Sequence, residues 1–403
     1  MGGIVIIGGG QAGSSLASKL RNLGCDGEIT LICGEPVPPY QRPPLSKQYL
    51  LGEMEKERLY LRPQSFYDEQ NITLMLDTQV SSIDPAARSI HANGQDIAYD
   101  QLALTTGSDP RMLPDEIGGA LKGVFAVRTL ADVDAMAAAF TPGKRVLIVG
   151  GGYIGLEAAA VASKLGLSVT LIELAPRILQ RVACPETSDY FRDLHKGQGV
   201  DLREGVGLKR LTGEAHVDGA ELGDGSMLDL DFVVVGVGIT PATGLAEAAG
   251  LTIDNGIAVD GEGRTSDAHI WAAGDCASFP YKGGRIRLES VQNAIDQAEC
   301  VAENMLGAGK TYFPQPWFWS DQYDIKLQIA GLSTGYDGIV LRPGTQPGMQ
   351  SHWYYKGDRL LAVDAMNDTR GYMVGKRLIE AGKSPDRDVI ANPETDLKAL
   401  LRA

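Results

Sequence analysis

Short runs of consecutive apolar residues recur along the chain, and two of them head closely similar stretches. Residues 4–7 (IVII) and 146–149 (VLIV) are each followed by a glycine-rich turn and then by a stretch of helical character. Continuous β-branched runs of this length are typical of buried strands. A second apolar run follows each predicted helix, at residues 29–33 (ITLIC) and 169–173 (VTLIE). The pattern therefore predicts the same strand–turn–helix–strand unit twice.

The turn of each unit carries a dinucleotide-binding motif. Residues 8–13 (GGGQAG) and 150–155 (GGGYIG) both fit Gly-x-Gly-x-x-Gly. In this pattern the first glycine permits the tight turn, the second admits a pyrophosphate and the third lets helix and strand pack closely. The helix N-terminus then attracts the anion. Two such units predict an α/β protein with two Rossmann-like domains, in which a nicotinamide can pass a hydride to a flavin.

An acidic residue lies near the end of the second strand of each unit. Glu35 is 22 residues beyond Gly13 and Glu173 is 18 residues beyond Gly155, close to the usual spacing of about 20. Such a carboxylate can bind ribose hydroxyls, and at Glu173 it favours NADH over NADPH because it repels a 2′-phosphate. Arg177 is near in sequence and would weaken this preference; we interpret it as a solvated surface charge.

A third segment can close a flavin site. Residues 270–275 predict a strand that ends in a Gly-Asp turn, where Asp275 can accept hydrogen bonds from ribityl hydroxyls. Further on, Ser290 is a candidate N-cap for a helix that begins within residues 289–294. If such a helix points at the flavin N1–O2 edge, it stabilises the negative charge that develops on reduction.

Composition and charge narrow the function classes. The chain has 403 residues, enough for two or three domains, and its 37 basic against 51 acidic residues give a net charge of −14. That balance argues against nucleic-acid or anionic-membrane binding, and a redox partner would need a local basic patch. The sequence shows no membrane span and no signal-peptide layout, which predicts a cytoplasmic protein. We see no obvious exposed apolar stripe, and this favours a monomer.

The cysteines and histidines have no metal-binding or redox spacing. Five cysteines occur without a Cys-x-x-Cys pair, and the five histidines lack metal-ligand spacing. We therefore expect reduced thiols, no metal site and no iron–sulfur cluster in this chain. Disulfide reductases and the NADH oxidases or coenzyme A-disulfide reductases of similar architecture need a redox cysteine after the first unit, but no cysteine occurs between Cys33 and Cys184.

Proline positions and the second unit suggest the domain organisation. We expect a discontinuous FAD-binding domain at residues 1–110 and 243–315, with an NAD-binding domain at 111–242 inserted into it. Residues 316–403 alternate short β-like runs, such as 325–329, with turns and a helix near 373–381, which predicts a C-terminal α+β domain.

Taken in order, these landmarks resemble the FAD-dependent NADH:ferredoxin reductases of bacterial oxygenase systems, the putidaredoxin reductase-like family. The resemblance covers essentially the whole chain. Its most specific pieces are residues 40–47 (YQRPPLSK), 105–107 (TTG), 274–276 (GDC), 289–294 (ESVQNA) and 317–323 (WFWSDQY). It implies a glutathione reductase-like architecture, FAD in the first unit and NAD in the second. It also implies a C-terminal domain that packs over the flavin and supports contacts with a protein partner.

The resemblance also implies roles for particular residues. FAD would be bound by the first glycine motif, the loop after it and the later flavin segment: Gly8, Gly10, Ala12, Gly13, Glu35, Arg42, Lys47, Val80 by its backbone, Arg128, Asp275 and Val291. NAD would be bound by the second motif and its acidic residue: Gly150, Gly152, Ile154, Gly155 and Glu173. In such enzymes the loop lysine and a motif-helix glutamate can pair near flavin N5, so Lys47 and Glu157 are the candidate catalytic residues.

The implied reaction converts a two-electron donor into two one-electron transfers. NADH reduces FAD, and single electrons then pass to two successive [2Fe–2S] ferredoxin molecules that feed a haem monooxygenase. An acidic ferredoxin would dock transiently on a basic patch. The docking candidates are Trp319, Arg62, Arg370, Lys376 and Arg377. A rubredoxin reductase and the reductase component of a ring-hydroxylating dioxygenase remain open, as does an NAD(H)-responsive redox sensor or interaction flavoprotein.

Overall fold

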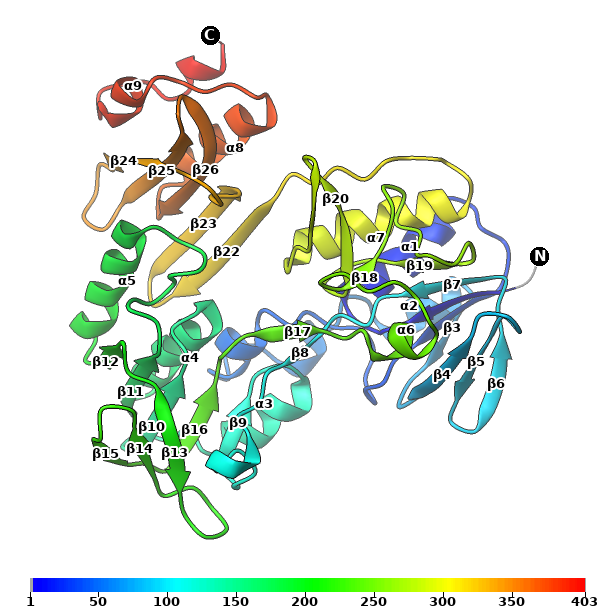
Figure 1. Cartoon of the computed structure of the whole chain (residues 1–403), viewed down its shortest axis with the longest axis horizontal. Helices are drawn as coiled ribbons and strands as arrows, with labels where there is room; N and C mark the ends of the chain where they lie inside the picture. Colours follow the sequence, from blue (N-terminus) through cyan, green and yellow to red (C-terminus); the bar gives the residue numbers. More distant parts are fainter. Residues whose placement is uncertain (1–2, 403) are drawn as a thin grey trace. The chain divides into compact units, whose positions relative to one another are not determined.

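The computed structural model describes residues 3–402, and the chain clusters into two units (Figure 1). The first contains the residues up to Arg42, Glu55–Asp109 and Ile239–Pro314. The second contains Pro43–Met54, Pro110–Gly238 and the residues from Gln315 onward. Residues 43–54 thus cluster with the second unit rather than with the remainder of 1–110. Residues 1, 2 and 403, which the predicted domains include, lie outside the described residues.

A parallel five-stranded sheet forms the centre of the first unit. Its strands lie in the order β19-β7-β1-β2-β3, and all four pairings are parallel. Helices α1 and α7 pack side by side, joined by ion pairs from Lys19 to Glu299 and Glu303 (Figure 1). The apolar run at β1 is buried throughout because side chains pack on both faces of the sheet. The bounds are β1 Ile4–Ile7, α1 Gln11–Asn22, β2 Ile29–Ile32, β3 Ile72–Met75, β7 Gln101–Leu104, β19 Ile270–Ala272 and α7 Val291–Met305.

Smaller elements complete the first unit. They are a three-stranded antiparallel sheet, a second small sheet, the β8–β17 pair and three short helices. Their bounds are β4 Val80–Asp84, β5 Ser89–Ala92, β6 Gln95–Ala98, β8 Ser108–Pro110, β17 Ile239–Pro241, β18 Ile257–Ala258, β20 Ala277–Tyr281, β21 Gly284–Ile286, η2 Lys56–Arg58, α2 Gln64–Glu69 and α6 Gly244–Ala248.

The second unit repeats the parallel architecture. Its sheet has the order β12-β11-β10-β16-β9, again with parallel pairings, and β13, β14 and β15 form an antiparallel sheet beside it. The bounds are β9 Val124–Ala126, α3 Leu130–Ala137, β10 Arg145–Val149, α4 Tyr153–Lys164, β11 Ser168–Glu173, α5 Pro185–Gly197, β12 Asp201–Glu204, β13 Leu208–Thr212, β14 Gly219–Leu222, β15 Met227–Asp229 and β16 Phe232–Val235. Two short helical turns, η1 (Leu45–Tyr49) and η3 (Asp115–Ile117), belong to the same unit.

The C-terminal part of the second unit is an antiparallel sheet covered by α8 on one face (Figure 1). The strand order is β22-β23-β26-β25-β24. The bounds are β22 Trp317–Gln322, β23 Ile325–Gly331, β24 Gly338–Pro343, β25 Gln350–Lys356, β26 Arg359–Met366, α8 Thr369–Glu380, α9 Arg387–Ala391 and η4 Ala399–Leu401. The sequence patterns predicted the sheet and α8 but did not resolve β22 and β25 as strands.

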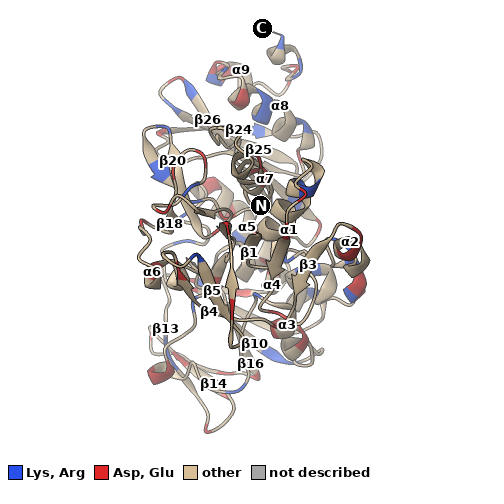
Figure 2. Cartoon of the chain, turned by 90° about the vertical axis from the view of Figure 1, so that its right-hand side faces the viewer, with Lys and Arg blue, Asp and Glu red and all other residues tan. Residues whose placement is uncertain are grey.

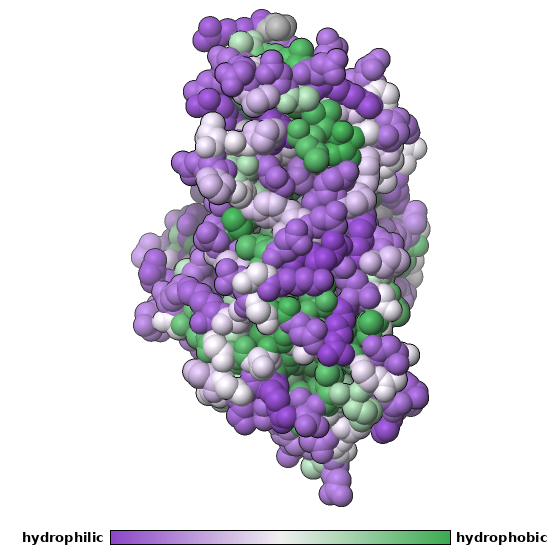
Figure 3. All heavy atoms as spheres, turned by 90° about the vertical axis from the view of Figure 1, so that its left-hand side faces the viewer, coloured by the Kyte–Doolittle hydropathy of each residue, from purple (hydrophilic) through white to green (hydrophobic). Residues whose placement is uncertain are grey.

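The surface of the second unit bears scattered apolar residues. Figure 3 shows hydrophobic patches separated by hydrophilic residues on one face of the molecule. The large exposed hydrophobic residues of this unit include Leu174, Met227 and Leu341, which lie on different elements. Among residues 3–402, no helix is long and apolar enough to cross a membrane.

Candidate functional site

The first glycine motif is built as a cradle. A Cβ atom at Gly8 (φ +119°) would overlap the carbonyl oxygen of Thr105, and one at Gly13 would overlap the carbonyl oxygen of Gly8. A Cβ atom at Gly10, in contrast, would meet no protein atom within 4 Å. Gly10 is also the N-cap of α1, and no side chain caps that helix. The outer glycines are thus required for packing, while the middle one faces space at an uncapped helix N-terminus, as a pyrophosphate group requires.

The second motif has the same construction. A Cβ atom at Gly150 (φ +110°) would overlap the carbonyl oxygen of Gly236, and one at Gly155 would overlap that of Gly150. Gly152 has open space around it and begins α4, again with no side-chain cap. Ile154, in the first turn of α4, is 42% exposed. Both cradles therefore have the shape and the uncapped helix N-terminus that a dinucleotide requires.

Glu35 lies three residues beyond β2 and is held by two side chains of the same unit. The Tyr40 hydroxyl donates to Glu35 Oε2 at 2.6 Å, and Arg42 Nη2 donates to Oε1 at 2.7 Å. Val80 begins β4, next to Gln79, whose amide donates to the carbonyl oxygen of Gly34. The structure thus brings Glu35 and Arg42 into direct contact and places Val80 near the strand end that carries them.

The predicted flavin segment of the first unit has an ordered hydrogen-bond arrangement. Ser108 Oγ donates to Asp275 Oδ2 at 3.2 Å. Ser290 caps α7, since its hydroxyl accepts from the Asn293 N–H at 3.2 Å, and Val291 is the first residue of that helix. This confirms the predicted N-cap. Sequence reasoning missed Gln297, one helical turn beyond Asn293, whose amide oxygen accepts from the Gly274 N–H at 2.9 Å.

Arg128 belongs to the second unit. It follows β9 and directly precedes Thr129, the residue that caps α3 through a capping box. The structure therefore places Arg128 on a different unit from Asp275 and Val291.

Glu173 is the last residue of β11, and both of its carboxylate oxygens accept backbone N–H groups. Oε2 accepts from Gly151 at 2.7 Å and Oε1 from Ala175 at 2.8 Å. Arg177 is not the solvated charge we expected. Its guanidinium donates to the Ser188 hydroxyl at 2.6 Å and to the carbonyl oxygens of residues 180, 183 and 184. Because its donors are used to fold the loop before α5, Arg177 is not available to a 2′-phosphate.

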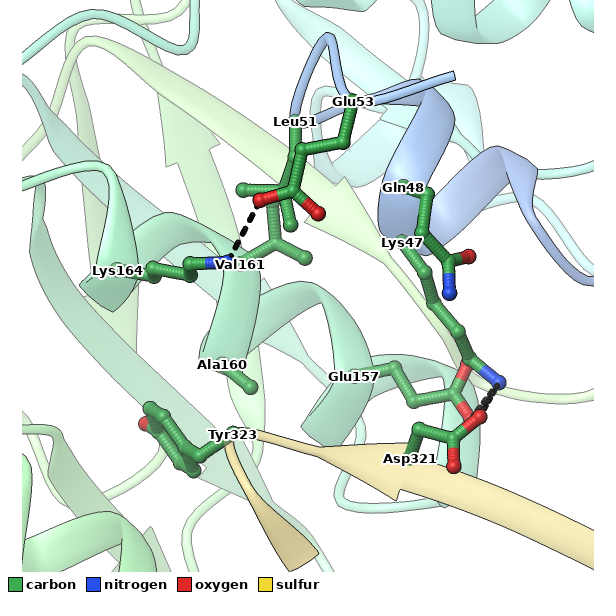
Figure 4. Close-up of a pocket in the computed structure, with 10 residues that line it drawn as sticks. All are labelled: Lys47, Gln48, Leu51, Glu53, Glu157, Ala160, Val161, Lys164, Asp321 and Tyr323. Carbon is green, nitrogen blue, oxygen red and sulfur yellow. Dashed lines mark hydrogen bonds and ion pairs between the residues drawn. The ribbon is translucent and has the colours of Figure 1, made fainter. Parts of the chain in front are cut away.

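Lys47 and Glu157 form a buried ion pair in the second unit (Figure 4). Lys47 lies in η1 and Glu157 in α4, with 3.0 Å between Lys47 Nζ and Glu157 Oε1. Their side chains are only 11% and 7% exposed. Asp321 Oδ2 of β22 is 3.5 Å from the same ammonium, and the Trp319 ring centroid is 6.0 Å from Nζ. The two candidate catalytic residues, 110 positions apart in the sequence, are thus direct partners.

Two hydroxyl groups complete the surroundings of Glu157. Ser320 Oγ donates to Oε1 at 2.8 Å, and Ser46 Oγ donates to Oε2 at 3.1 Å. Burial raises the pKa of the Glu157 carboxyl above its usual range, and Lys47 and the two hydroxyls only partly oppose this shift. The carboxyl therefore gains a proton more readily than an exposed glutamate does.

Lys47 and Glu157 face a pocket of about 130 Å³ within the second unit. Figure 4 shows the wall formed by η1, α4 and β22, and the polar side chains that line it also include Glu53, Lys164 and Tyr323. Glu53 and Lys164 pair with each other at 2.8 Å. The pocket contains both a carboxylate and an ammonium that water reaches poorly, so it can orient a small polar ring and control protons at its edge.

A basic hollow lies at the C-terminal end of the second unit. It has a volume of about 720 Å³ and is lined by Arg370, Arg377, Lys398 and Arg402 around the apolar side chain of Met373. Figure 2 shows the basic residues on α8 and on the last segment of the chain. Arg370 and Arg377 were docking candidates from the sequence, whereas Lys398 and Arg402 were missed.

The remaining docking candidates lie elsewhere. The ammonium of Lys376 donates to Glu380 Oε1 at 2.6 Å and does not line the hollow. Arg62 belongs to the first unit and lies over the Phe66 ring. Trp319 lies in β22, where its ring is near those of Trp317 and Phe318. The structure thus brings two of the five candidates together.

Four of the five cysteine thiols are buried, which makes them weak nucleophiles. All five cysteines are free, and Cys33, Cys184, Cys276 and Cys300 are buried. Burial raises the pKa of Cys33 to about 12 and also raises the pKa values of the other three above the usual range. Among residues 3–402, no group of three or more Cys, His, Asp or Glu side chains is arranged to hold a metal ion.

The fold and the two cradles define an oxidoreductase that binds two dinucleotides. Comparison with known families agrees: residues 2–298 match the model of the pyridine nucleotide-disulphide oxidoreductases, and residues 317–401 match the reductase C-terminal domain. The chain therefore belongs to the pyridine nucleotide-disulphide oxidoreductase family, and it is an FAD-dependent oxidoreductase that uses a pyridine nucleotide.

Individual relatives match over almost their full length. The ferredoxin reductase subunit of 5,5′-dehydrodivanillate O-demethylase from Sphingobium sp. (strain NBRC 103272 / SYK-6) is 43% identical, over 99% of this chain and 98% of that protein. Putidaredoxin reductase of Pseudomonas putida is 39% identical, over 99% and 97% of the two chains. The structure of a covalent putidaredoxin reductase–putidaredoxin complex matches with a TM-score of 0.96 and 38% identity, over 99% and 98% of the two chains.

Proposed function

We propose that the protein is an FAD-dependent NADH:ferredoxin reductase of an oxygenase system. It passes the reducing equivalents of NADH one electron at a time to a [2Fe–2S] ferredoxin that serves a haem monooxygenase. The observation that carries the proposal is the Lys47–Glu157 pair beside a glycine cradle, in a chain whose buried thiols have raised pKa values. Because these four buried thiols are poorly suited to receive electrons, we assign the role of acceptor to a separate protein.

The nucleotides are assigned to the two cradles as follows. Gly8, Gly10, Ala12 and Gly13 hold the pyrophosphate of FAD at the start of α1. Glu35, Arg42, Lys47, Val80, Arg128, Asp275 and Val291 complete the flavin site. Gly150, Gly152, Ile154, Gly155 and Glu173 hold NADH at the start of α4. In this proposal residues 1–110 and 243–315 form the FAD domain, 111–242 the NAD domain and 316–403 the C-terminal domain.

A matched pair of alanine variants tests this assignment. Since a Cβ atom at Gly10 or at Gly152 meets no protein atom within 4 Å, neither substitution disturbs the fold directly. Gly10→Ala is expected to lose FAD during purification, whereas Gly152→Ala keeps FAD and requires about tenfold more NADH for half-maximal rate. The flavin-to-protein absorbance ratio and the KM for NADH report the two effects. The opposite pattern would reverse the assignment.

Lys47 and Glu157 organise the transfer of hydride. When bound, FAD supplies a ring that takes up two electrons together and releases them singly. The Lys47 ammonium places positive charge in a poorly hydrated pocket, where it favours electron density on a neighbouring ring. Glu157 fixes the position of that ammonium and, through its carboxylate, can orient a nicotinamide amide.

The ferredoxin docks on the basic hollow formed by Arg370, Arg377, Lys398 and Arg402. The whole chain carries a net charge of −14, so an acidic partner is repelled except where basic residues gather. Trp319, in the same unit, extends the docking surface in this proposal, whereas Lys376 pairs with Glu380 and lies outside it. The protein acts in the cytoplasm, where its thiols remain reduced, and it acts as a monomer.

An anaerobic spectroscopic titration tests the proposed function. NADH is expected to bleach the flavin absorbance of the holoenzyme, and oxidised [2Fe–2S] ferredoxin is expected to restore it within one turnover time. A bleached flavin that persists in the presence of ferredoxin would contradict the proposal and favour a redox sensor. Recovery with rubredoxin but not with ferredoxin would identify the alternative acceptor class.

A further inference from the structure

A chain of buried polar side chains runs from Glu157 into the interior of the second unit. Ser320 Oγ lies 2.8 Å from Glu157 Oε1, and Gln322 Nε2 lies 3.2 Å from Ser320 Oγ. Gln322 Oε1 lies 2.9 Å from His195 Nε2, and the Tyr323 hydroxyl lies 3.3 Å from His195 Nδ1. Ser320, Gln322 and His195 are each 0% exposed, so no water replaces these contacts.

The direction of each hydrogen bond in this chain follows from its neighbour. The Glu157 carboxylate can only accept, so the single hydrogen of the Ser320 hydroxyl points at Glu157. Ser320 must then accept from the amide nitrogen of Gln322, which turns the amide oxygen toward His195. An amide oxygen only accepts, so the imidazole hydrogen lies on His195 Nε2, and His195 Nδ1 accepts from Tyr323. All four hydrogens point toward Glu157.

The charge state of His195 agrees with this order. Burial lowers the pKa of His195 to about 4, so its imidazole stays neutral above that pH. A protonated imidazole would carry a hydrogen on Nδ1 and could not accept from the Tyr323 hydroxyl. The His195 and Tyr323 rings also meet edge to face, with centroids 5.1 Å apart, which restrains the imidazole.

The backbone at Tyr323 adds an independent observation. Tyr323 is the first of the two residues that join β22 to β23, and its φ is +55°. Two-residue hairpin turns favour glycine or asparagine where φ is positive, and a bulky side chain is strained there. The chain nevertheless places a tyrosine at this position, where its hydroxyl reaches His195 and its ring lines the pocket that Glu157 faces (Figure 4).

We propose that Ser320, Gln322, His195 and Tyr323 are positioning residues that form one oriented hydrogen-bond chain and hold Glu157 as a carboxylate directed at Lys47. The inference rests on the proposed function of the Lys47–Glu157 pair and extends it to four residues outside the glycine motif. Hydrogen bonds aligned in one direction polarise one another, so the terminal bond to a charged acceptor is stronger than an isolated one.

The charged groups around Glu157 are few in this pocket. Lys47 of η1 contacts it directly, and Asp321 of β22 contacts the same Lys47 ammonium at 3.5 Å. Glu53 and Lys164, further along the wall, pair with each other. Because burial favours the protonated form of Glu157 while Lys47 and the oriented chain favour the carboxylate, the loss of one donor shifts protonation to higher pH.

The first test is the pH dependence of flavin bleaching by NADH in the holoenzyme. Ser320→Ala removes the terminal donor, and we expect the apparent pKa of the acid limb to rise by about one unit. Tyr323→Phe removes the distal hydroxyl, and we expect a smaller rise in the same direction. Tyr190→Phe is the matched control, since Tyr190 lies on the same helix as His195 but its hydroxyl donates to the carbonyl oxygen of Gly348.

In Glu157→Gln we expect the rate of bleaching no longer to fall at acid pH, which assigns that fall to Glu157. If the apparent pKa of the fall were then unchanged in both Ser320→Ala and Tyr323→Phe, the proposal would be overturned. A shift of the Tyr190→Phe variant equal to that of Tyr323→Phe would also overturn it.

The second test does not depend on catalysis. Nitrogen-15 NMR of the five histidines in the holoenzyme reports the tautomer of each ring, and the spectrum of His195→Gln assigns the His195 signals. We expect His195 to carry its hydrogen on Nε2 and not to titrate between about pH 5 and pH 9. A hydrogen on Nδ1, or titration in this range, would disprove the oriented chain even if the reductase activity were as proposed. If NADH failed to reduce the flavin, the same spectrum would still decide whether the chain exists.

Discussion

Replacing Lys47 by methionine removes the charge of one partner of the buried Lys47–Glu157 ion pair and changes little else. Methionine keeps an unbranched apolar side chain of similar length but leaves the Glu157 carboxylate without its cation. Removing one partner of a buried ion pair costs about 3–5 kcal/mol because the remaining charge stays buried. Ser46 and Ser320 still donate to Glu157, so we expect the lower end of that range, about 3 kcal/mol at pH 8.

The loss should depend on pH with a definite sign. Burial already raises the pKa of Glu157 above the value it has in the unfolded chain, and the loss of Lys47 raises the pKa further. Protonation removes the uncompensated charge. The destabilisation of Lys47→Met is therefore complete above the raised pKa and becomes smaller as the pH falls through it.

Urea unfolding of the holoenzyme at about pH 8 and about pH 5, followed by tryptophan fluorescence, measures both effects. Lys164→Met is the matched control in the same pocket. Lys164 pairs with Glu53, and the two side chains are 55% and 50% exposed. We therefore expect Lys164→Met to lower the free energy of unfolding by less than about 1 kcal/mol. The double variant Lys47→Met/Glu157→Gln should recover most of the stability. A loss of stability in Lys47→Met no larger than that in Lys164→Met at pH 8, or a loss that grows toward acid pH, would show that Lys47 does not neutralise a buried Glu157 carboxylate.

Three further predictions concern other parts of the chain. Glu173→Gln should raise the ratio of NADPH to NADH kcat/KM about tenfold, since a charge that repels a 2′-phosphate is removed; an unchanged ratio would deny Glu173 that role. Arg370→Glu/Arg377→Glu should lower the rate of ferredoxin reduction at low salt and remove most of its salt dependence, whereas Lys376→Glu should change it little. Equal effects of the double variant and of Lys376→Glu would show that the ferredoxin does not dock on the hollow lined by Arg370 and Arg377. Burial raises the pKa of Asp364 to about 6, so its neutral form stabilises the folded state. This contribution is complete below the pKa of Asp364 in the unfolded chain and is lost as the pH rises through about 6. Unfolding curves should therefore show that Asp364→Asn gains stability relative to the parent protein between pH 4.5 and pH 7, and a constant difference would contradict the shift.

The parts of the structure that the sequence predicted are local. Each glycine motif lies within a few residues of its strand and helix, and the steric reason for each glycine acts over that distance. The helix cap at Ser290 follows from the same kind of local pattern. The pairing of Lys47 with Glu157 came from the family resemblance, since no spacing rule connects two residues on separate elements.

The parts that were missed depend on packing between distant segments. Ser320, Gln322 and His195 approach Glu157 only because β22, α5 and α4 pack together, and Ser and Gln carry no signal of their own in a β-strand. Arg177 was predicted to be solvated because the carbonyl oxygens that surround it come from a loop without a recognisable motif.

The basic hollow contains residues that the sequence predicted and residues that it did not. Arg370 and Arg377 were found by their charge, while Lys398 joins them only through the packing of the last residues of the chain. The pairing of Lys376 with Glu380, in contrast, could have been predicted from its i, i+4 spacing.

Electron delivery to a ferredoxin is measured by NADH-driven reduction of cytochrome c by the holoenzyme, with and without an added bacterial [2Fe–2S] ferredoxin. We expect a slow rate without ferredoxin and a large increase that saturates with ferredoxin concentration and weakens as salt is added. If NADH still bleaches the flavin but ferredoxin does not increase the rate, this chain does not deliver electrons to a ferredoxin.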